Sequence, residues 1–305
     1  MSLHRISTHQ VTWIDIVHPS GADVQSLRTL LPYIHPLHLE DILSPTERPK
    51  LDEMDNYLYV VLHFPRWDKQ ASITRAREVD FVVGRDYLVT AHDGELPPLQ
   101  NMRESCDVDQ LQRQQLLAKS GAALFYAMVR RLLDYIEPIL NKVGSNVAHI
   151  EDHIFDQDAR HLIQKISVVR RDIIALRRII RSQISVLESL SNLEHVIIQE
   201  GMDEYFGDVD DKIKRYRDTL DEHYEVINGL ADTANMLATY RINDVMRVLT
   251  VISVIILPLS LITGVYGMNV ELPLAEHPWV FVGIALSMVA LAVGMLAWFR
   301  IRGWL

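Results

Sequence analysis

A row of mostly polar or small side chains runs through an otherwise apolar stretch near the end of the chain. Its members are spaced by alternating threes and fours, so a helix would place them on one face. They are Asn243, Met246, Thr250, Ser253, Leu257, Ser260 and Gly264. Such a face is typical of a helix that lines a narrow, water-filled path for an ion. Leu249 and Leu257 would narrow the path as apolar collars. The alternative is a helix that faces lipid, in which the hydroxyls would only bond back to carbonyls of their own helix.

The tripeptide Gly267-Met268-Asn269 follows this row directly. The Asn269 amide offers a neutral oxygen to an ion that arrives with its water. Because Mg²⁺ dehydrates reluctantly, selection through its hydration shell is easier than direct coordination by protein atoms. Glu271 and Glu276 nearby would concentrate cations at the same mouth. Taken alone, the tripeptide also fits a helix cap followed by a turn.

Two uncharged apolar segments would position these residues, 248–266 and 279–299. At about 1.5 Å per residue, each is long enough to cross roughly 30 Å of hydrocarbon. The connector 267–278 has no lysine or arginine, whereas arginines flank both segments on their other sides: Arg241, Arg247, Arg300 and Arg302. The bias of basic residues toward the cytoplasm therefore predicts that both termini, including the basic tail 300–305, are cytoplasmic.

The segment 208–247, before the first apolar segment, reads as a stalk helix. It contains no proline, and its apolar residues repeat by threes and fours: Val209, Ile213, Tyr216, Leu220, Ile227, Leu230, Ala234 and Leu237. Joined to the first apolar segment, it predicts one helix of about 60 residues. Because one hairpin cannot enclose a pore, a conducting path requires a symmetric ring of identical subunits.

Residues 1–108 mix strand-like runs with short helical segments, which predicts an α/β domain. The runs are VTWIDIV, YLYVVLHFPRW and VDFVVGRDYLVTAHD, and the helical segments begin at SGADVQSL and HPLHLEDIL. Residues 109–207 read as helical, with one helix from Gln110 to about Phe155 and another from Ala159 to about Asn192.

The composition excludes several classes of function. The formal charge of −10 over 305 residues disfavours nucleic acid as a partner. The single cysteine, Cys106, excludes an internal disulfide and a cysteine zinc cage. There is no phosphate-binding glycine loop and no nucleophile elbow, so neither an enzyme, an organic cofactor nor an ATP-driven pump is predicted.

Three stretches carry a resemblance to the CorA family of magnesium and cobalt channels. They are IHPLHLEDIL with RPK at 34–50, NDVMRVLTVISVIILPLSLITGVYGMN at 243–269, and the terminal RGWL. The resemblance implies an α+β membrane protein assembled as a homopentameric funnel in a bacterial inner membrane. Each subunit would carry a cytoplasmic α/β domain, a stalk helix continuing into the pore-lining first transmembrane helix, and a second transmembrane helix at the C-terminus.

The resemblance also implies roles for single residues. Asn269 would be the outer selectivity ring, Asn243 an inner polar ring, and Met246, Leu249, Leu257 and Ser260 would line the path. Cytoplasmic Mg²⁺, bound between subunits by Asp41 and Asp232, would regulate influx of Mg²⁺ and of Co²⁺ or Ni²⁺ down the gradient. Glu40 and Asp208 would assist, although Arg130 stands where a third acidic ligand is expected.

Two other functions remain open on the sequence. A sister branch, resembling ZntB, moves zinc with proton coupling and usually changes the signature tripeptide, so the intact Gly-Met-Asn favours magnesium. The other alternative is a membrane-anchored metal sensor that conducts nothing.

Overall fold

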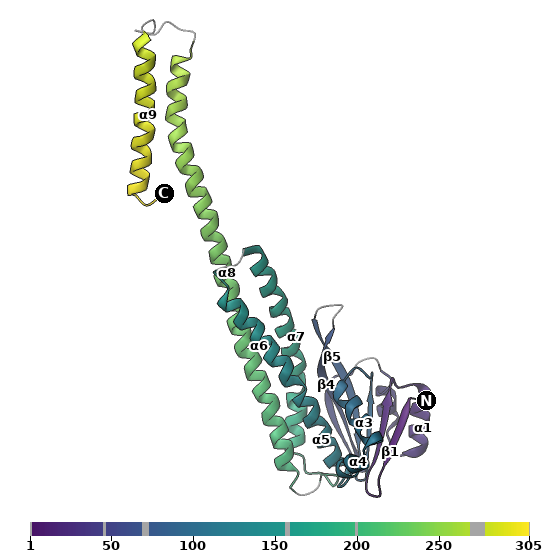
Figure 1. The fold of residues 1–305 in the computed structure, drawn as a ribbon. Coiled ribbons are helices and arrows are strands. Elements are labelled where there is room, and N and C mark those ends of the chain that lie inside the picture. The colour runs from purple at the N-terminus through teal and green to yellow at the C-terminus, as the bar shows by residue number, and fades with distance from the viewer. Residues whose placement is uncertain are drawn as a thin grey trace. The chain divides into compact units, whose positions relative to one another are not determined.

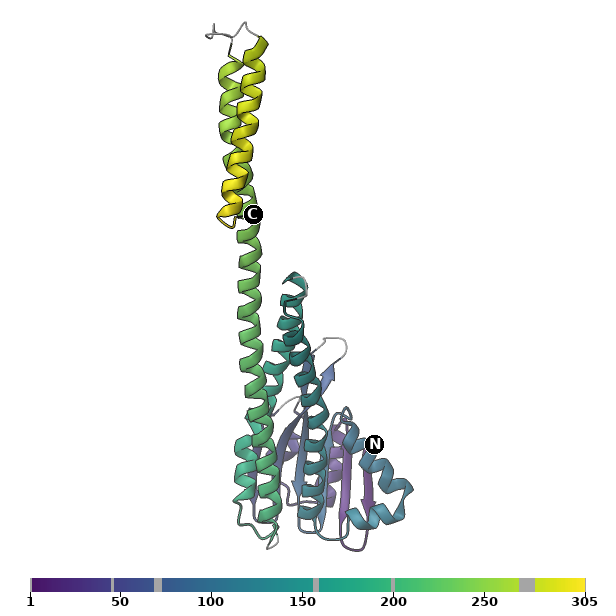
Figure 2. The same cartoon turned by 60° about the vertical axis from the view of Figure 1, so that its left-hand side comes forward.

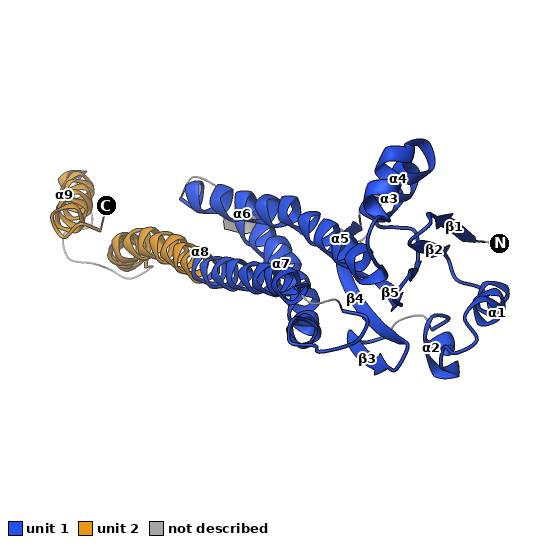
Figure 3. Cartoon of the chain, turned by 90° about the horizontal axis from the view of Figure 1, so that it is seen from below, with its two compact units in different colours: residues 1–231 blue, residues 232–305 orange. Residues whose placement is uncertain are grey.

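The computed structural model describes residues 2–44, 47–68, 73–155, 159–198, 201–268 and 278–304. Clustering of its contacts divides the chain into two units, residues 1–231 and 232–305 (Figure 3). Helix α8 (Asp203–Tyr266) contributes its first part to unit 1 and the rest to unit 2. The two units are described separately.

A six-stranded sheet forms the centre of the N-terminal domain (Figure 1). Its strands, in spatial order, are β1 (Leu3–Ser7), β2 (Thr12–Val17), β6 (Tyr87–His92), β5 (Ile73–Val83), β4 (Tyr57–Asp68) and β3 (Lys50–Met54). Only β2 and β6 pair in parallel among these strands. The last strand-like run becomes two strands, because Gly84 N–H bonds to the Tyr87 carbonyl at 3.0 Å and turns the chain. The edge strands β1 and β3 were not predicted.

Helices cover both faces of this sheet. On one face the Phe81 ring of β5 lies 5.0 Å from that of Phe125 in α5 (Gly121–Asp134). Because side chains alternate along a strand, the adjacent Asp80 points to the opposite face. That face carries α1 (Gly21–Leu30) and α2 (Pro36–Asp41), and Asp80 there shares a cavity with Ile42, just beyond α2. The domain is thus a three-layer α/β arrangement, as expected from the mixed strand and helix patterns.

The predicted single helix from Gln110 to Phe155 is wrong, because the chain breaks it twice. The segment forms α4 (Gln110–Leu116), α5 and α6 (Ile136–Asp152), and α3 (Pro97–Val108) precedes it. Ser120 begins α5 as its N-cap, accepting a hydrogen bond from Ala123 N at 3.2 Å. Pro138 cannot donate to the carbonyl of Asp134, so α5 ends there and α6 begins two residues later. Helix α7 (Ala159–Ser191) agrees closely with its prediction.

Helix α8 is a single helix of 64 residues, as the sequence predicted for the stalk and the first apolar segment. The predicted apolar stripe is buried from Val209 to Ala234, and Leu237 is half-buried. In unit 1 this stripe packs against the helical layer: Phe206 lies 5.9 Å from Phe125, and Tyr216 Oη donates to the Leu133 carbonyl at 3.2 Å. The stripe therefore explains why the first part of α8 belongs to unit 1.

Unit 2 consists of the remainder of α8 and of α9 (Pro278–Ile301) (Figure 2). Both helices contain stretches long and apolar enough to cross a membrane, and little of those stretches is buried within the chain. Pro258 lies inside α8, and the helix continues through it. Surfaces of this kind need lipid or other protein around them, because exposed apolar area of this extent is costly in water.

Candidate functional site

The face of α8 predicted to line a path is exposed throughout the described part of unit 2. Asn243, Thr250, Ser253, Ser260 and Gly264 are all exposed. So are the apolar members of the row, Met246, Leu249 and Leu257. Among the residues that the structure describes, no side chain covers this face, so it is free to meet other copies or water.

The hydroxyls on this face are partly engaged by their own helix. Thr250 Oγ1 donates to the Met246 carbonyl at 2.7 Å, and Ser253 Oγ donates to the Leu249 carbonyl at 2.9 Å. This is the bonding expected for hydroxyls in lipid, one of the two interpretations of the sequence. A hydroxyl that donates its proton keeps its oxygen lone pairs, so both side chains can still accept hydrogen bonds from water on an ion.

The signature tripeptide begins where α8 ends. Gly267 N donates to the Thr263 carbonyl at 2.9 Å, and Met268 is exposed. Gly267 therefore closes the last turn, in agreement with a helix cap. The predicted selectivity residue Asn269 and the cation-attracting Glu271 and Glu276 lie outside the described residues.

The predicted regulatory carboxylate Asp41 lies at the end of α2. This short helix is positioned by Pro36 in its first turn and by His35, whose ring accepts a hydrogen bond from Leu37 N at 3.2 Å. Asp41 Oδ2 accepts a hydrogen bond from Lys50 Nζ at 2.6 Å. Burial alone would lower the pKa of Lys50, but its hydrogen bond and charge interaction with Asp41 raise the pKa, so the lysine stays cationic.

Lys50 belongs to a connected group of side chains on β3, β4 and α2. Its ammonium lies 3.8 Å from Asp52 Oδ2 and 5.3 Å from the centre of the Tyr59 ring. His38 Nε2 lies 3.2 Å from the same Asp52 oxygen, and His38 stacks on Tyr59 with ring centres 4.3 Å apart. Burial lowers the pKa of His38 despite the opposing charge of Asp52. Asp41 therefore faces a lysine held by aromatic and acidic neighbours.

The other predicted regulatory residues are exposed and belong to both units. Glu40 and Asp208 are exposed in unit 1, and Asp232 is exposed in unit 2. Asp208 interacts with the charge of Arg130, which also donates to Tyr126 Oη at 3.3 Å. Within the described ranges, no three His, Cys, Asp or Glu side chains come together to hold a metal. Carboxylate oxygens are hard donors of the kind that Mg²⁺ prefers.

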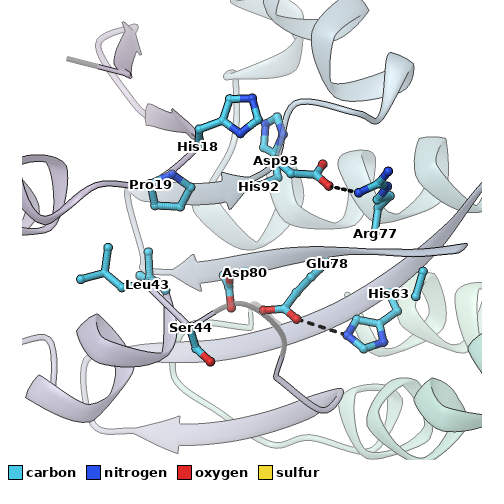
Figure 4. A pocket seen from close by; sticks show the side chains of 12 residues that line it. His18, Pro19, Leu43, Ser44, His63, Arg77, Glu78, Asp80, His92 and Asp93 are labelled. Atoms are coloured by element: carbon cyan, nitrogen blue, oxygen red, sulfur yellow. Dashed lines mark hydrogen bonds and ion pairs between the residues drawn. The ribbon is translucent and has the colours of Figure 1, made fainter.

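A cavity of about 350 Å³ opens on the same face of the sheet, beside the end of α2 (Figure 4). Most of its charged groups already have partners. Arg77 Nη1 bonds to Asp93 at 3.0 Å, and His63 Nε2 lies 3.4 Å from Glu78 Oε2 (Figure 4). Asp80, deeper in the cavity, accepts a hydrogen bond from Tyr59 Oη at 2.7 Å. Burial raises the pKa of Asp80 to about 8 against the lowering effect of that bond, and the charge of Glu78 raises it further.

Sequence reasoning missed the role of Lys50. Its contact with Asp41 depends on β3 lying beside α2, which the RPK stretch alone does not predict. A lysine nine positions after an acidic residue has no helical or strand periodicity that would predict a pair, so this contact could be found only in the fold.

Comparison with known proteins covers nearly the whole chain. Residues 8–301 match the family model described as CorA-like Mg²⁺ transporter protein. The chain is 30% identical to the putative metal ion transporter YfjQ of Bacillus subtilis, over 96% of this chain and 89% of that protein. It is 28% identical to the cobalt/magnesium transport protein CorA of Thermotoga maritima, over 96% of this chain and 83% of that protein. The CorA magnesium transporter structure from Methanocaldococcus jannaschii superposes with a TM-score of 0.85 at 21% identity, covering 98% of this chain and 94% of that one.

Proposed function

Since this chain belongs to the CorA-like Mg²⁺ transporter family, we propose that it is a channel through which hydrated Mg²⁺ enters the cytoplasm down its electrochemical gradient. Co²⁺ and Ni²⁺ are further candidate cargo, as the name of the Thermotoga relative suggests for cobalt. An inside-negative potential would contribute about 4.6 kcal/mol per 100 mV for a divalent ion.

One observation carries the proposal: along its membrane-crossing length, α8 exposes the face on which the hydroxyls of Thr250, Ser253 and Ser260 alternate with apolar side chains. If five copies place this face around a common axis, Asn243 forms a polar ring on the cytoplasmic side and Leu249 and Leu257 form apolar collars. Thr250, Ser253 and Ser260 supply hydroxyl oxygens between them. An ion that keeps its water can pass such a lining without binding tightly to any one ring.

The outer end of the path is assigned to Gly267, Met268 and Asn269. Five neutral amides at Asn269 would bind the water shell of the ion, and Glu271 and Glu276 would raise the local cation concentration. The neutral amide discriminates by the size and strength of the hydration shell, because it offers no charge to strip the ion.

Regulation is assigned to the cytoplasmic carboxylates. Asp41 of one copy and Asp232 of a neighbouring copy would share a Mg²⁺ ion, with Glu40 and Asp208 in support. The carboxylates repel one another without a cation between them, so loss of Mg²⁺ would separate the subunits and open the path. The ionic interaction of Asp208 with Arg130 makes Asp208 the weaker of the two auxiliary ligands.

Reconstitution into liposomes tests the transport proposal. An inside-negative potential should drive Mg²⁺ entry, measured with an enclosed fluorescent indicator. Asn269→Ala should abolish selective entry while leaving the oligomer intact, and Asn192→Ala, at the exposed end of the α7 region, should behave as wild type. Retention of selective Mg²⁺ entry by Asn269→Ala would refute the selectivity assignment.

The same preparation separates the alternatives. Entry of Zn²⁺ in preference to Mg²⁺, with a rate set by an imposed pH gradient, would identify a proton-coupled zinc transporter. Absence of flux for every ion, together with intact metal binding, would identify a sensor.

A further inference from the structure

A lysine neutralises the proposed regulatory carboxylate within its own subunit. Lys50 Nζ lies 2.6 Å from Asp41 Oδ2, and the two side chains are 30% and 21% exposed. A pair this close and this well covered is screened by salt less than a pair on the open surface. A cation that binds to this oxygen of Asp41 therefore competes with the positive charge of Lys50.

A second acceptor for that lysine is already in reach. Asp52 Oδ2 lies 3.8 Å from Lys50 Nζ, and the two residues stand two apart on β3, so they share one face of the strand. A small rotation of the lysine stem could complete this second bond without movement of the backbone. The displaced ammonium would then remain paired.

The buried His38 ring holds the Asp52 carboxylate in position. His38 Nδ1 lies 2.9 Å from Tyr57 Oη, which accepts a bond from His35 N and can therefore donate to the ring. This tautomer leaves His38 Nε2 as a donor to Asp52 Oδ2 at 3.2 Å. Because His38 is 4% exposed and stacks on Tyr59, it holds Asp52 in a defined place beside the lysine.

We propose that Lys50 is an internal competitor for Mg²⁺ at Asp41: it pairs with Asp41 when Mg²⁺ is low and transfers to Asp52 when Mg²⁺ binds. The inference rests on the proposed regulatory role of Asp41. By this exchange, Lys50 and Asp52 set the Mg²⁺ concentration at which the channel closes. Lys50 lowers the apparent affinity because Mg²⁺ can bind only the fraction of subunits in which Asp41 is released, and Asp52 increases that fraction.

The exchange predicts opposite effects for two substitutions. Lys50→Met removes the competitor, so half-maximal Mg²⁺ binding should occur at a concentration about 1.5- to 5-fold lower, the range expected for loss of one partly exposed ion pair. Asp52→Asn removes the second acceptor, so the lysine remains on Asp41 and the midpoint should rise by a similar factor. Lys50→Gln also removes the charge and should lower the midpoint by the same factor. It replaces Lys50→Met in the test if the apolar methionine disturbs folding.

The measurement uses the full-length oligomer in detergent. Its melting temperature is followed against MgCl₂ concentration, because a ligand that binds the native state stabilises it. Inhibition of liposome flux by internal Mg²⁺ gives a second midpoint. Lys214→Met is the matched control: Lys214 pairs with Asp210 at 2.8 Å and is 31% exposed, so its removal should leave the Mg²⁺ midpoint unchanged.

A double substitution separates exchange from simple loss of charge. Asp52→Asn also removes a negative charge, which would weaken Mg²⁺ binding whether or not Lys50 is present. If the lysine exchange operates, the shift caused by Asp52→Asn should be smaller in the Lys50→Met background than in the wild type, because only the loss of charge remains. A shift of equal size in both backgrounds, or an equal shift in one direction for both single variants, would overturn the proposal.

Asp41→Asn separates a failure of the regulatory site from a failure of the lysine exchange. If it leaves the Mg²⁺ midpoint unchanged, the proposed regulatory site itself is wrong. If it abolishes the Mg²⁺ response while Lys50→Met and Asp52→Asn match wild type, the regulatory site stands and the lysine exchange is refuted.

Discussion

Two buried aspartates on one sheet behave differently because only one has a cationic partner. Asp15 accepts bonds from Thr90 Oγ1 at 2.6 Å and from Arg103 at 3.2 Å, and His92 Nε2 lies 3.0 Å away. Burial would raise the pKa of Asp15, but these partners together lower it. Asp80 is buried as deeply, and burial raises its pKa to about 8 because its bonded partner, the neutral Tyr59 hydroxyl, offsets only part of that effect. Burial acts in the same direction on both aspartates, and the partners decide whether it is outweighed.

The raised pKa of Asp80 predicts how stability depends on pH. Its folded value of about 8 lies above the ordinary value of 3.8, so between these values the native state binds more protons than the unfolded state. The contribution of Asp80 to stability is therefore greatest below pH 4 and declines as pH rises toward 8.

Asp80→Asn tests this prediction, because the amide keeps an oxygen for Tyr59 and cannot ionise. At pH 8 the variant should melt several degrees above wild type, at roughly 2–4 °C per kcal/mol. At pH 4, close to the ordinary pKa of 3.8, the two melting temperatures should be nearly equal. A pH-independent difference between the two proteins would show that Asp80 does not titrate in this range.

At the scale of elements, α7 and the first part of α8 are joined by a cluster around Asp221. Arg177 Nε donates to Asp221 at 2.7 Å, Arg181 donates to both carboxylate oxygens at 3.0 and 2.9 Å, and the Arg177 guanidinium lies 4.1 Å from the Tyr224 ring. Burial works against the charged form, but the arginines outweigh it and hold the pKa of Asp221 below its usual value. The ionised Asp221 therefore stabilises the folded state above about pH 4, and this stabilisation is lost as pH falls through the lowered pKa.

Asp221→Asn should therefore destabilise unit 1 by about 1–2 kcal/mol at neutral pH, since charge-assisted bonds are the stronger ones and partial exposure reduces their value. Chemical denaturation of the solubilised protein measures the loss. Asp218→Asn is the matched control, because Asp218 is 65% exposed and pairs with the adjacent Arg217. Its effect should stay within about 0.5 kcal/mol. Equal losses of stability in Asp221→Asn and Asp218→Asn would contradict the role of Asp221 in joining α7 to α8.

The second part of α8 carries its own prediction. Ser253→Ala and Thr250→Val remove oxygens from the face assigned to the path, and each should lower Mg²⁺ flux by about 2- to 10-fold, the value of one hydrogen bond. Ser287→Ala on α9 is the control, because Ser287 also donates to its own helix, to the Ile284 carbonyl at 2.8 Å. Equal losses at positions 253 and 287 would contradict the assignment of the α8 face.

The sequence predicted those elements whose patterns are long and uninterrupted. The apolar stripe of α8 spans many turns, so its burial from Val209 to Ala234 follows from periodicity alone. The short edge strands β1 and β3 give weak patterns, and the end of α5 depends on Pro138. The Asp41–Lys50 pair joins α2 to β3 and is set by tertiary packing, which single-chain patterns do not record.

At the scale of the whole molecule, the chain belongs to a transporter family and has two membrane-crossing helices joined by a connector without lysine or arginine. The net charge of −10 places an acidic chain around the proposed cation path. Arginines flank both helices at the ends away from the connector: Arg241 and Arg247 on α8, and Arg300 and Arg302 at the end of the chain. Charge placement thus predicts an orientation with the bulk of the chain on the cytoplasmic side.

Cysteine labelling tests that orientation. Cys106 is 1% exposed and is the single native cysteine, so Cys106→Ser gives a background that an impermeant maleimide does not label. In intact cells, Ala275→Cys in the connector should be labelled from outside. Ser2→Cys should be labelled only after the membrane is opened, because moving the basic flanks to the outer side opposes the positive-inside bias. The reverse pattern would place the Asp41 site outside the cell, and regulation by cytoplasmic Mg²⁺ would then be physically impossible.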